Sequence, residues 1–281
     1  MLEEVDLIEP GEQAHAPAFR RLRAYRGAAK EVGWFAFNVA IWPLGLVDEA
    51  VRGSARKVRL RKPKQVAMPR RRPTKDAAQV PIILVHGYFH NRSGLVVMER
   101  ALRKHGFQNV HTFSYNPLRK DIPALAEMLK QRVETVTMKT GCSRVHLVGH
   151  CLGGLVCRYY VEKLSGCHRV HTVVTIGTPH KGTVIAYGGR SPAARQMRPD
   201  SQFIKEMVRC RKPRSVRYLS YYTNLDAIVV PSTSAILANG NGSRVKNILV
   251  HDLGHLSLLI SPELIGSIAS NLSDLDSEGC A

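Results

Sequence analysis

The chain of 281 residues is long enough for one sizeable hydrophobic core and an extension. Its hydrophobic content of 44% and charged content of 22% are ordinary for a soluble globular protein, but its formal net charge of +19 is not. So basic a chain is expected to contact something anionic: nucleic acid, an acidic membrane surface or an anionic ligand. The six cysteines show neither a paired framework nor metal-type CxxC spacing, which argues against a disulfide scaffold.

Residues 1–51 are predicted to form a helical and apolar N-terminal extension. The acidic start lacks the basic and apolar regions of a secretory signal, so we expect reduced thiols and a cytoplasmic protein. Residues 33–47 carry no charge and include Trp34 and Trp42. As a helix they would span about 22 Å, which is short of the ~30 Å hydrocarbon core. We expect either an interfacial membrane segment or a hydrophobic helix docked on the main domain.

Residues 52–78 are predicted to be an exposed basic linker. Residues 52–75 contain eleven Lys or Arg, no acidic residue and three prolines, which argue against regular structure. A basic cluster beside an apolar segment suits attraction to anionic phospholipid, at about 1 kcal/mol per residue. No aromatic platform or recognition motif indicates specific nucleic-acid binding. Residues 33–75 are therefore expected to contact an anionic membrane surface, and a solvated linker is the alternative.

Residues 79–281 are predicted to form one α/β domain, in which apolar strand-like runs alternate with helix-like segments. The expected strands are 79–87, 109–116, 144–150, 170–178, 215–223 and 245–250, and the expected helices are about 94–105, 121–140, 151–164 and 262–272. This alternation predicts a mostly parallel sheet with helices on both faces. Residues 184–213 form an insertion between strands, where either a lid or an ordinary surface excursion would lie.

The sharpest local signal is a glycine-rich turn between a strand and a helix, with Cys151 at its centre. Gly149 and Gly153 stand two residues before and two residues after Cys151. A nucleophile on such a strained turn needs glycine at both positions, because side chains there would collide. The turn lifts the thiol clear of the sheet and places it at a helix N-terminus, where the dipole favours an anion. This pattern predicts a nucleophile elbow.

Five motifs in chain order make the sequence similar to the compact bacterial lipases of the α/β-hydrolase superfamily. They are HGY at 86–88, GHCLGG at 149–154, GTPHKGT at 177–183, NLD at 224–226 and GHLSLL at 254–259. The resemblance covers about residues 79–272. It implies an α/β-hydrolase fold and a lipase or esterase that acts on an acyl ester or lipid without a cofactor.

The order of catalytic residues in that family implies Cys151 as nucleophile, Asp226 as acid and His255 as base. Their positions agree, because Asp226 follows a strand and His255 lies in the loop after the last strand. The rival candidates are Asp200 and Asp252 for the acid and His251 for the base.

The same resemblance implies an oxyanion hole made by the backbone N–H groups of Tyr88 and Leu152. The neighbouring histidines are expected to be structural: His86 ordering the oxyanion loop, His150 packing on the scaffold and His180 shaping the rim of the site. None of them has a second ligand at suitable spacing, so no metal site is predicted.

Cys151 departs from the resemblance, which implies serine at this position. Free thiols ionise near pH 8.5 and need less help from a base than hydroxyls do. The larger sulfur would also shift the attacked carbonyl, and a misplacement of about 1 Å can cost ~100-fold in rate. Three functions follow: a cysteine hydrolase of esters or thioesters, an acyltransferase similar at the elbow to polyhydroxyalkanoate synthases, and a non-catalytic lipid-binding protein.

Overall fold

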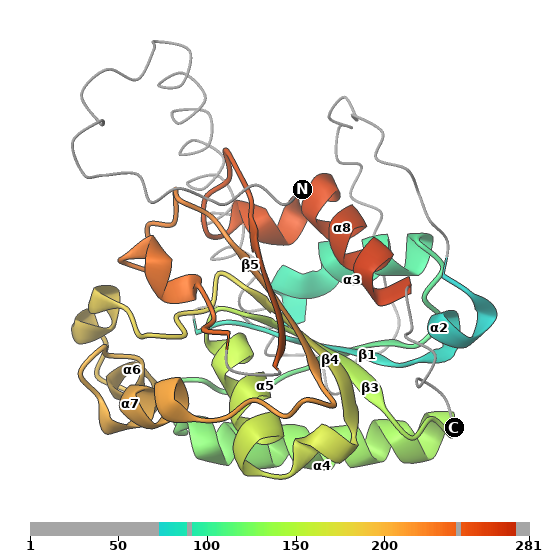
Figure 1. Ribbon diagram of the computed structural model, residues 1–281, viewed down its shortest axis with the longest axis horizontal. Helices are drawn as coiled ribbons and strands as arrows, with labels where there is room; N and C mark the ends of the chain where they lie inside the picture. Colours follow the sequence, from blue (N-terminus) through green and yellow to red (C-terminus); the bar gives the residue numbers. More distant parts are fainter. Residues whose placement is uncertain (1–72, 89–91, 240–242, 274–281) are drawn as a thin grey trace.

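The computed structural model describes residues 73–88, 92–239 and 243–273 (Figure 1). The predicted extension at 1–51 and most of the predicted linker at 52–78 lie outside these residues. The end of that linker range forms a short helix, α2 (Lys75–Gln79), which is capped by the Thr74 hydroxyl and buries Ala77 and Ala78. Part of the predicted linker range is therefore helical and packed on the domain.

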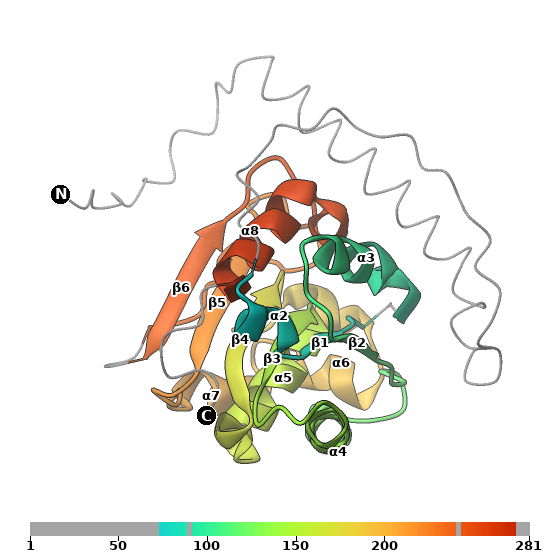
Figure 2. The ribbon, with the colours of Figure 1, turned by 90° about the vertical axis from the view of Figure 1, so that its right-hand side faces the viewer.

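Six described strands form one sheet in the order β2-β1-β3-β4-β5-β6, and every neighbouring pair is parallel (Figure 2). The strands are β1 (Ile82–Val85), β2 (Val110–Phe113), β3 (Val145–His150), β4 (Val170–Ile176), β5 (Arg217–Tyr222) and β6 (Arg244–Leu249). The remaining α-helices are α3 (Val96–Lys104), α4 (Ile122–Thr140), α5 (Leu152–Lys163), α6 (Pro192–Gln196), α7 (Gln202–Arg209) and α8 (Pro262–Ser273). The 3₁₀ turns are η2 (Arg92–Leu95), η3 (Gly166–His168), η4 (Val184–Gly188), η5 (Ser232–Ala235) and η6 (Ser257–Ile260).

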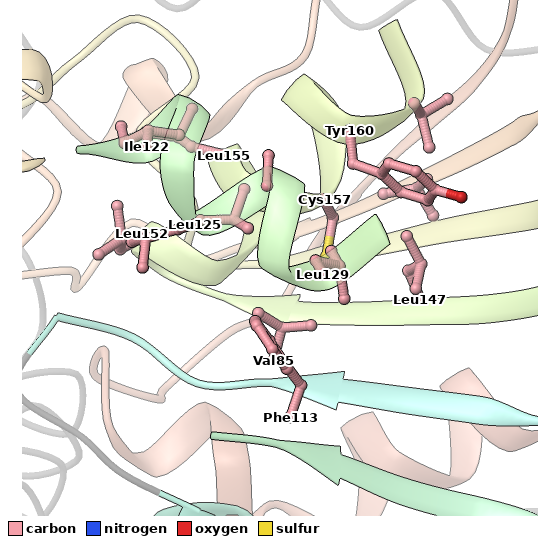
Figure 3. Close-up of a cluster of buried hydrophobic side chains, with 14 of the residues drawn as sticks. Val85, Phe113, Ile122, Leu125, Leu129, Leu147, Leu152, Leu155, Cys157 and Tyr160 are labelled. Carbon is pink, nitrogen blue, oxygen red and sulfur yellow. The ribbon is translucent and has the colours of Figure 1, made fainter. Parts of the chain in front are cut away.

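Helices cover both faces of the sheet, which confirms the predicted fold class. In Figure 2, α3 and α8 lie on one face, and α4 and α5 lie on the other. The strand period of two divides the core accordingly: Ile83 and Val85 of β1 pack with the α4–α5 cluster, while Ile82 and Leu84 pack with the α3–α8 cluster. Figure 3 shows the first cluster, in which apolar side chains of the sheet meet those of α4 and α5.

The longest described helix, α4, has the end signals that its sequence predicts. The Asp121 carboxylate accepts a hydrogen bond from the N–H of Ala124 at 2.9 Å, which satisfies one of the unpaired donors of the first turn. Gly141 ends the helix in the left-handed conformation, with φ of 72°. None of the described helices is both long and apolar enough to cross a membrane.

Strand order determines where a ligand can approach the sheet. The chain runs from β1 outward to β2 and then returns past β1 to β3, so the direction of winding reverses between β1 and β3. In open parallel sheets, ligands bind at the carboxyl ends of the strands that flank such a reversal. The loop with Gly87 and Tyr88 follows β1, and Cys151 follows β3. The predicted oxyanion and nucleophile positions therefore meet at this point.

The insertion at 184–213 is partly helical and contains η4, α6 and α7. Ser191 and Ser201 cap α6 and α7 through their hydroxyls. Both helices pack on the domain, because Ala194 and Met207 are buried in the α4–α5 cluster. The η4 turn is different, because its larger side chains, Val184, Ile185 and Tyr187, are exposed. A lid at this position stays a prediction.

Candidate active site

The turn between β3 and α5 holds Cys151 in a strained conformation, with φ of 52° and ψ of −120°. Positive φ in a non-glycine residue is sparsely populated, and residues that adopt it cluster at functional sites. A Cβ atom at Gly149 would lie 2.6 Å from the backbone of Gly153, and one at Gly153 would collide with the carbonyl oxygen of Val85. Both elbow glycines are therefore sterically required, as their spacing predicts.

A buried His–Asp pair lies beside the elbow. His255, in the loop after β6, donates from Nδ1 to Oδ2 of Asp226 at 2.8 Å, and both side chains are almost fully buried. The other carboxylate oxygen, Oδ1, accepts hydrogen bonds from the N–H groups of Ile228 at 2.9 Å and Val229 at 2.7 Å. These two backbone donors hold the carboxylate in the orientation that meets the imidazole.

The Cys151 sulfur lies close enough to His255 to raise the pKa of the ring. Since Asp226 occupies Nδ1, the nitrogen that meets the thiol is Nε2. Burial by itself lowers the pKa of His255, but the Asp226 carboxylate and the Cys151 sulfur raise it well above the usual value. These two groups therefore make the ring a stronger base than a free imidazole.

Two further glycines border these three residues. Gly177 has φ of 52°, and a Cβ atom there would lie 3.0 Å from Nδ1 of His255 and 3.3 Å from Oδ2 of Asp226. A Cβ atom at Gly87 would lie 2.9 Å from Cβ of Cys151. Sequence reasoning did not identify either glycine as part of the site. Both lie within the motifs at 86–88 and 177–183, but motif spacing does not show what a glycine touches.

The predicted oxyanion residues border the thiol from two sides. Leu152 is the first residue of α5, and the N–H of a first helical residue has no acceptor within its own helix. Tyr88 follows Gly87 in the loop after β1, and its hydroxyl lies 2.7 Å from Oγ of Ser191, the residue that caps α6. This contact joins the oxyanion loop to the insertion at 184–213.

The rival catalytic candidates lie elsewhere. Asp200 is exposed, and its carboxylate accepts a hydrogen bond from the Tyr187 hydroxyl at 2.6 Å. Asp252 and His251 are exposed as well. The structure thus brings Cys151 and the buried His–Asp pair together and leaves the three rivals on the surface.

The neighbouring histidines have structural contacts. His86 stacks on Tyr115 with ring centroids 4.1 Å apart, and its Nε2 accepts a hydrogen bond from the N–H of Tyr115 at 3.3 Å. Burial lowers the pKa of His86 to about 4, so the ring is neutral near pH 7. Nε2 of His150 lies 3.3 Å from the carbonyl oxygen of His255. His180 is buried, and its partners come from distant parts of the sequence. That it shapes the rim of the site stays a prediction.

Among the residues that the structure describes, no three His, Cys, Asp or Glu side chains are grouped so that they could hold a metal ion. The cysteines within the same ranges are free thiols: Cys142, Cys151, Cys157, Cys167 and Cys210.

Comparison with known sequences places the chain in a family. The sequence model of the palmitoyl protein thioesterase family matches residues 81–225. A triacylglycerol lipase of Burkholderia plantarii is 31% identical over 169 residues, which are 57% of this chain and 42% of that protein. Another, of Pseudarthrobacter phenanthrenivorans, is 32% identical over 121 residues, which are 40% of this chain and 37% of that protein. The matched segments therefore cover less than half of either relative.

Solved structures agree on the fold. The mature form of a Bacillus licheniformis lipase superimposes with a TM-score of 0.61 at 19% identity, over 72% of this chain and 94% of that one. Aspergillus fumigatus lipase B gives a TM-score of 0.59 at 18% identity, over 73% of this chain and 56% of that one. At such identities the likeness shows the fold alone, which is that of the α/β-hydrolases.

Proposed function

Because this chain belongs to the palmitoyl protein thioesterase family of the α/β-hydrolases, we propose that it hydrolyses acyl esters with Cys151 as nucleophile, His255 as base and Asp226 as the acid that orients the base. One observation carries this proposal. A buried imidazole is held by a carboxylate at 2.8 Å, and its pKa is raised both by that carboxylate and by a thiol on a strained strand-to-helix turn. That is the arrangement by which a nucleophile, a base and an orienting group form covalent intermediates.

The reaction would proceed in two halves. In the first, the thiol of Cys151 gives its proton to Nε2 of His255, and its sulfur attacks the acyl carbonyl carbon. The N–H groups of Leu152 and Tyr88 stabilise the resulting oxyanion. The imidazolium then protonates the leaving group, which departs and leaves a thioester on the enzyme. In the second half, His255 takes a proton from water, the hydroxide oxygen attacks the thioester, and the fatty acid and free thiol are released.

Thioesters should be the better substrates. Attack by Cys151 on a thioester exchanges one thioester for another, whereas attack on an oxygen ester must form a less stable acyl compound than the one it consumes. Acyl transfer is the second candidate function, because a thioester intermediate can pass its acyl group to an alcohol or thiol as well as to water. Cysteine at position 151 is the observation that favours it.

The test compares p-nitrophenyl esters with thioesters of the same acyl length, using the wild type, Cys151→Ala and Cys151→Ser. We expect turnover in the wild type, none in Cys151→Ala, and an acyl adduct on Cys151 detectable by mass spectrometry. Unchanged activity in Cys151→Ala would remove this residue from the mechanism. Transfer to an added alcohol that outpaces hydrolysis would favour the acyltransferase. An inactive wild type with a strongly active Cys151→Ser would favour the non-catalytic lipid-binding protein.

We also propose that the enzyme works on an anionic membrane surface, through residues 33–75 and through the face around the site. In the described part of the chain, eight large hydrophobic residues are exposed. Six of them end a strand or follow its carboxyl end, on the side of the sheet where Cys151 lies: Leu118, Val184, Ile185, Tyr187, Leu225 and Leu249. Exposed basic residues, including Lys120, Arg190 and Arg195, lie on the same side. Apolar contact with basic surroundings suits anionic lipid. A cytoplasmic setting stays a prediction.

Vesicle co-sedimentation tests the membrane proposal. The full chain is compared with one that begins at residue 73, so that α2 and its Thr74 cap stay intact. We expect binding to phosphatidylglycerol vesicles and weaker binding to phosphatidylcholine, with the shortened chain binding less than the full one. Equal binding of both chains would exclude a role for residues 33–75. A double variant, Arg190→Glu with Arg195→Glu, tests the face around the site. Its charge-matched control is Lys104→Glu with Lys139→Glu, at the C-terminal ends of α3 and α4.

A further inference from the structure

A buried chain of hydrogen bonds joins α5, the helix that follows the elbow, to β5, the strand that precedes the acid. Arg158 on α5 donates from Nη1 to Nδ1 of His180 at 3.2 Å, because a guanidinium has no acceptor. The hydrogen of the ring is then on Nε2, which donates to Oγ1 of Thr175 at 3.1 Å. Thr175 donates to Oγ of Ser220 on β5 at 3.0 Å, and Ser220 donates to the carbonyl of Ala235 at 2.9 Å. Nε2 of His180 also lies 3.3 Å from Oγ of Ser220.

This chain of hydrogen bonds requires a neutral imidazole, and the surroundings of His180 keep the ring neutral. Burial, followed by the charges of Arg158 and Lys212, lowers the pKa of His180 well below its usual value. Arg158 is itself fixed on its other side. Its Nε and Nη2 atoms contact the carboxylate of Glu162 at 2.9 and 3.0 Å, and Nη2 also donates to the carbonyl of Met207 on α7 at 2.9 Å.

This ion pair is buried, since the side chain of Arg158 is 1% exposed and that of Glu162 is 0% exposed. Buried ion pairs add little net stability, because desolvation offsets their attraction, and apolar residues of similar volume often serve as well. An apolar pair could not replace the hydrogen bonds of Arg158. The guanidinium carries N–H donors in a fixed geometry, and they hold His180 and α7 in defined positions relative to α5.

The loop that follows β4 connects this chain of hydrogen bonds to the catalytic groups. Its first residue, Gly177, packs directly against His255 and Asp226. The side chain of its second residue, Thr178, fills the space that a Cβ atom of Gly154 on α5 would need. The loop is thus wedged between the helix behind the thiol and the buried pair. His180, two residues further on, anchors it.

We propose that Arg158 and His180 are positioning residues that hold this loop, and through it set the separation between the Cys151 thiol and the His255–Asp226 pair. The inference rests on the proposed function of those three residues. Arg158 lies seven residues after Cys151 on α5, roughly 10 Å along the helix axis, so it acts through the loop and not on the substrate. Small displacements matter at such a site, since about 1 Å can cost ~100-fold in rate.

Three variants test the proposal on the full chain. His180→Phe removes both ring hydrogen bonds, and His180→Gln keeps one donor and one acceptor. Arg158→Met combined with Glu162→Leu removes the hydrogen bonds from Arg158 to His180 and to α7 without leaving a buried charge unpaired. The measurements are kcat and KM for a p-nitrophenyl ester, the denaturation midpoint, and the pH dependence of Cys151 alkylation by iodoacetamide, followed at its own peptide by mass spectrometry.

We expect His180→Phe and the double variant to lose about ten- to hundred-fold in kcat with little change in KM. Alkylation of Cys151 should need a higher pH in both variants, and His180→Gln should recover part of each loss. Leu129→Ala, a cavity variant in the core beneath α4, is the control: it should lower the denaturation midpoint and leave alkylation unchanged. Folded His180→Phe with wild-type kcat and wild-type alkylation would overturn the proposal.

The alkylation readout also separates this inference from the proposed function. A shifted pH dependence in His180→Phe, with no ester turnover in the wild type, would support the positioning role and count against the hydrolase. A different result would overturn the positioning role alone: the wild type turns over normally, and His180→Gln loses as much kcat and alkylation as His180→Phe. The hydrogen bonds that glutamine can still make would then have no effect.

Discussion

The substitution Asp226→Asn tests the buried pair at the level of single hydrogen atoms. In the wild type, Oδ1 of Asp226 accepts hydrogen bonds from two backbone N–H groups, at Ile228 and Val229. An asparagine must keep its carbonyl oxygen there, so its NH₂ group takes the place of Oδ2 and faces Nδ1 of His255. Nδ1 must then become an acceptor, and the ring hydrogen moves to Nε2. An Nε2 that carries a hydrogen cannot take the proton of Cys151.

The expected loss follows from the thiol's own acidity. An unassisted thiol with a pKa of about 8.5 is roughly 3% ionised at pH 7, so losing the base costs up to about 30-fold in kcat/KM from ionisation alone. At pH 9 about three quarters of the thiol ionises unaided, and this part of the loss should shrink to less than about two-fold. Serine enzymes with the corresponding asparagine lose about 10⁴-fold, because a hydroxyl cannot ionise by itself.

The assay is kcat/KM against pH from 5 to 10 for the wild type, Asp226→Asn and the control Asp200→Asn. The control removes an exposed carboxylate that binds the Tyr187 hydroxyl, and it should retain the wild-type profile. We expect the acidic limb of the Asp226→Asn profile to move to higher pH. A loss of the same size at every pH, or no loss at all, would refute the tautomer argument.

Three further outcomes are expected. Burial holds the pKa of His86 at about 4, so its folded form stays neutral where the unfolded form binds a proton; stability should fall as pH drops below 6.5, by about 2 kcal/mol at pH 5 from this group alone, measured by denaturant unfolding. Gly177→Ala, which places a Cβ at φ of 52° against the catalytic ring, should lower kcat at least ten-fold, whereas Gly188→Ala, with open space around it, should match the wild type in the same assay. Tyr88→Phe and Ser191→Ala each break the 2.7 Å contact between the oxyanion loop and α6, and each should lower kcat about three- to ten-fold. Because both remove the same contact, the double variant should lose no more kcat than the worse of the two single variants.

Sequence reasoning succeeds here where the determinant is local. The alternation of apolar runs and helical segments predicts the parallel sheet. The glycines two residues before and after Cys151 lie where the strand-to-helix turn leaves no room for a Cβ atom, and that the turn serves as a nucleophile elbow stays a prediction. The predicted strand 109–116 is longer than β2 (Val110–Phe113), since apolar pattern continues beyond the residues that pair with a neighbour.

It fails where the determinant lies far along the chain. Arg158 is separated by 22 residues from His180 and by 49 from Met207, and nothing in its local pattern shows that a guanidinium is buried there. The contacts of Gly177 with His255 and Asp226 are likewise set by three different strand ends. Helix α2 is too short for its periodicity to be read, and it is buried by packing on α8, at the other end of the domain.

The His255–Asp226 pair bears on what Cys151 does. A thiol that only bound lipid would gain nothing from a buried ionic pair, which is costly to desolvate. A thiol that only attacked an ester would need a base less than a hydroxyl does, because free thiols ionise near pH 8.5. Water needs a base more, and in the proposed mechanism water releases the acyl group from Cys151 only when His255 removes a proton from it. The buried pair therefore matters most in the second half of the reaction, which is where a hydrolase differs from a protein that merely holds an acyl group.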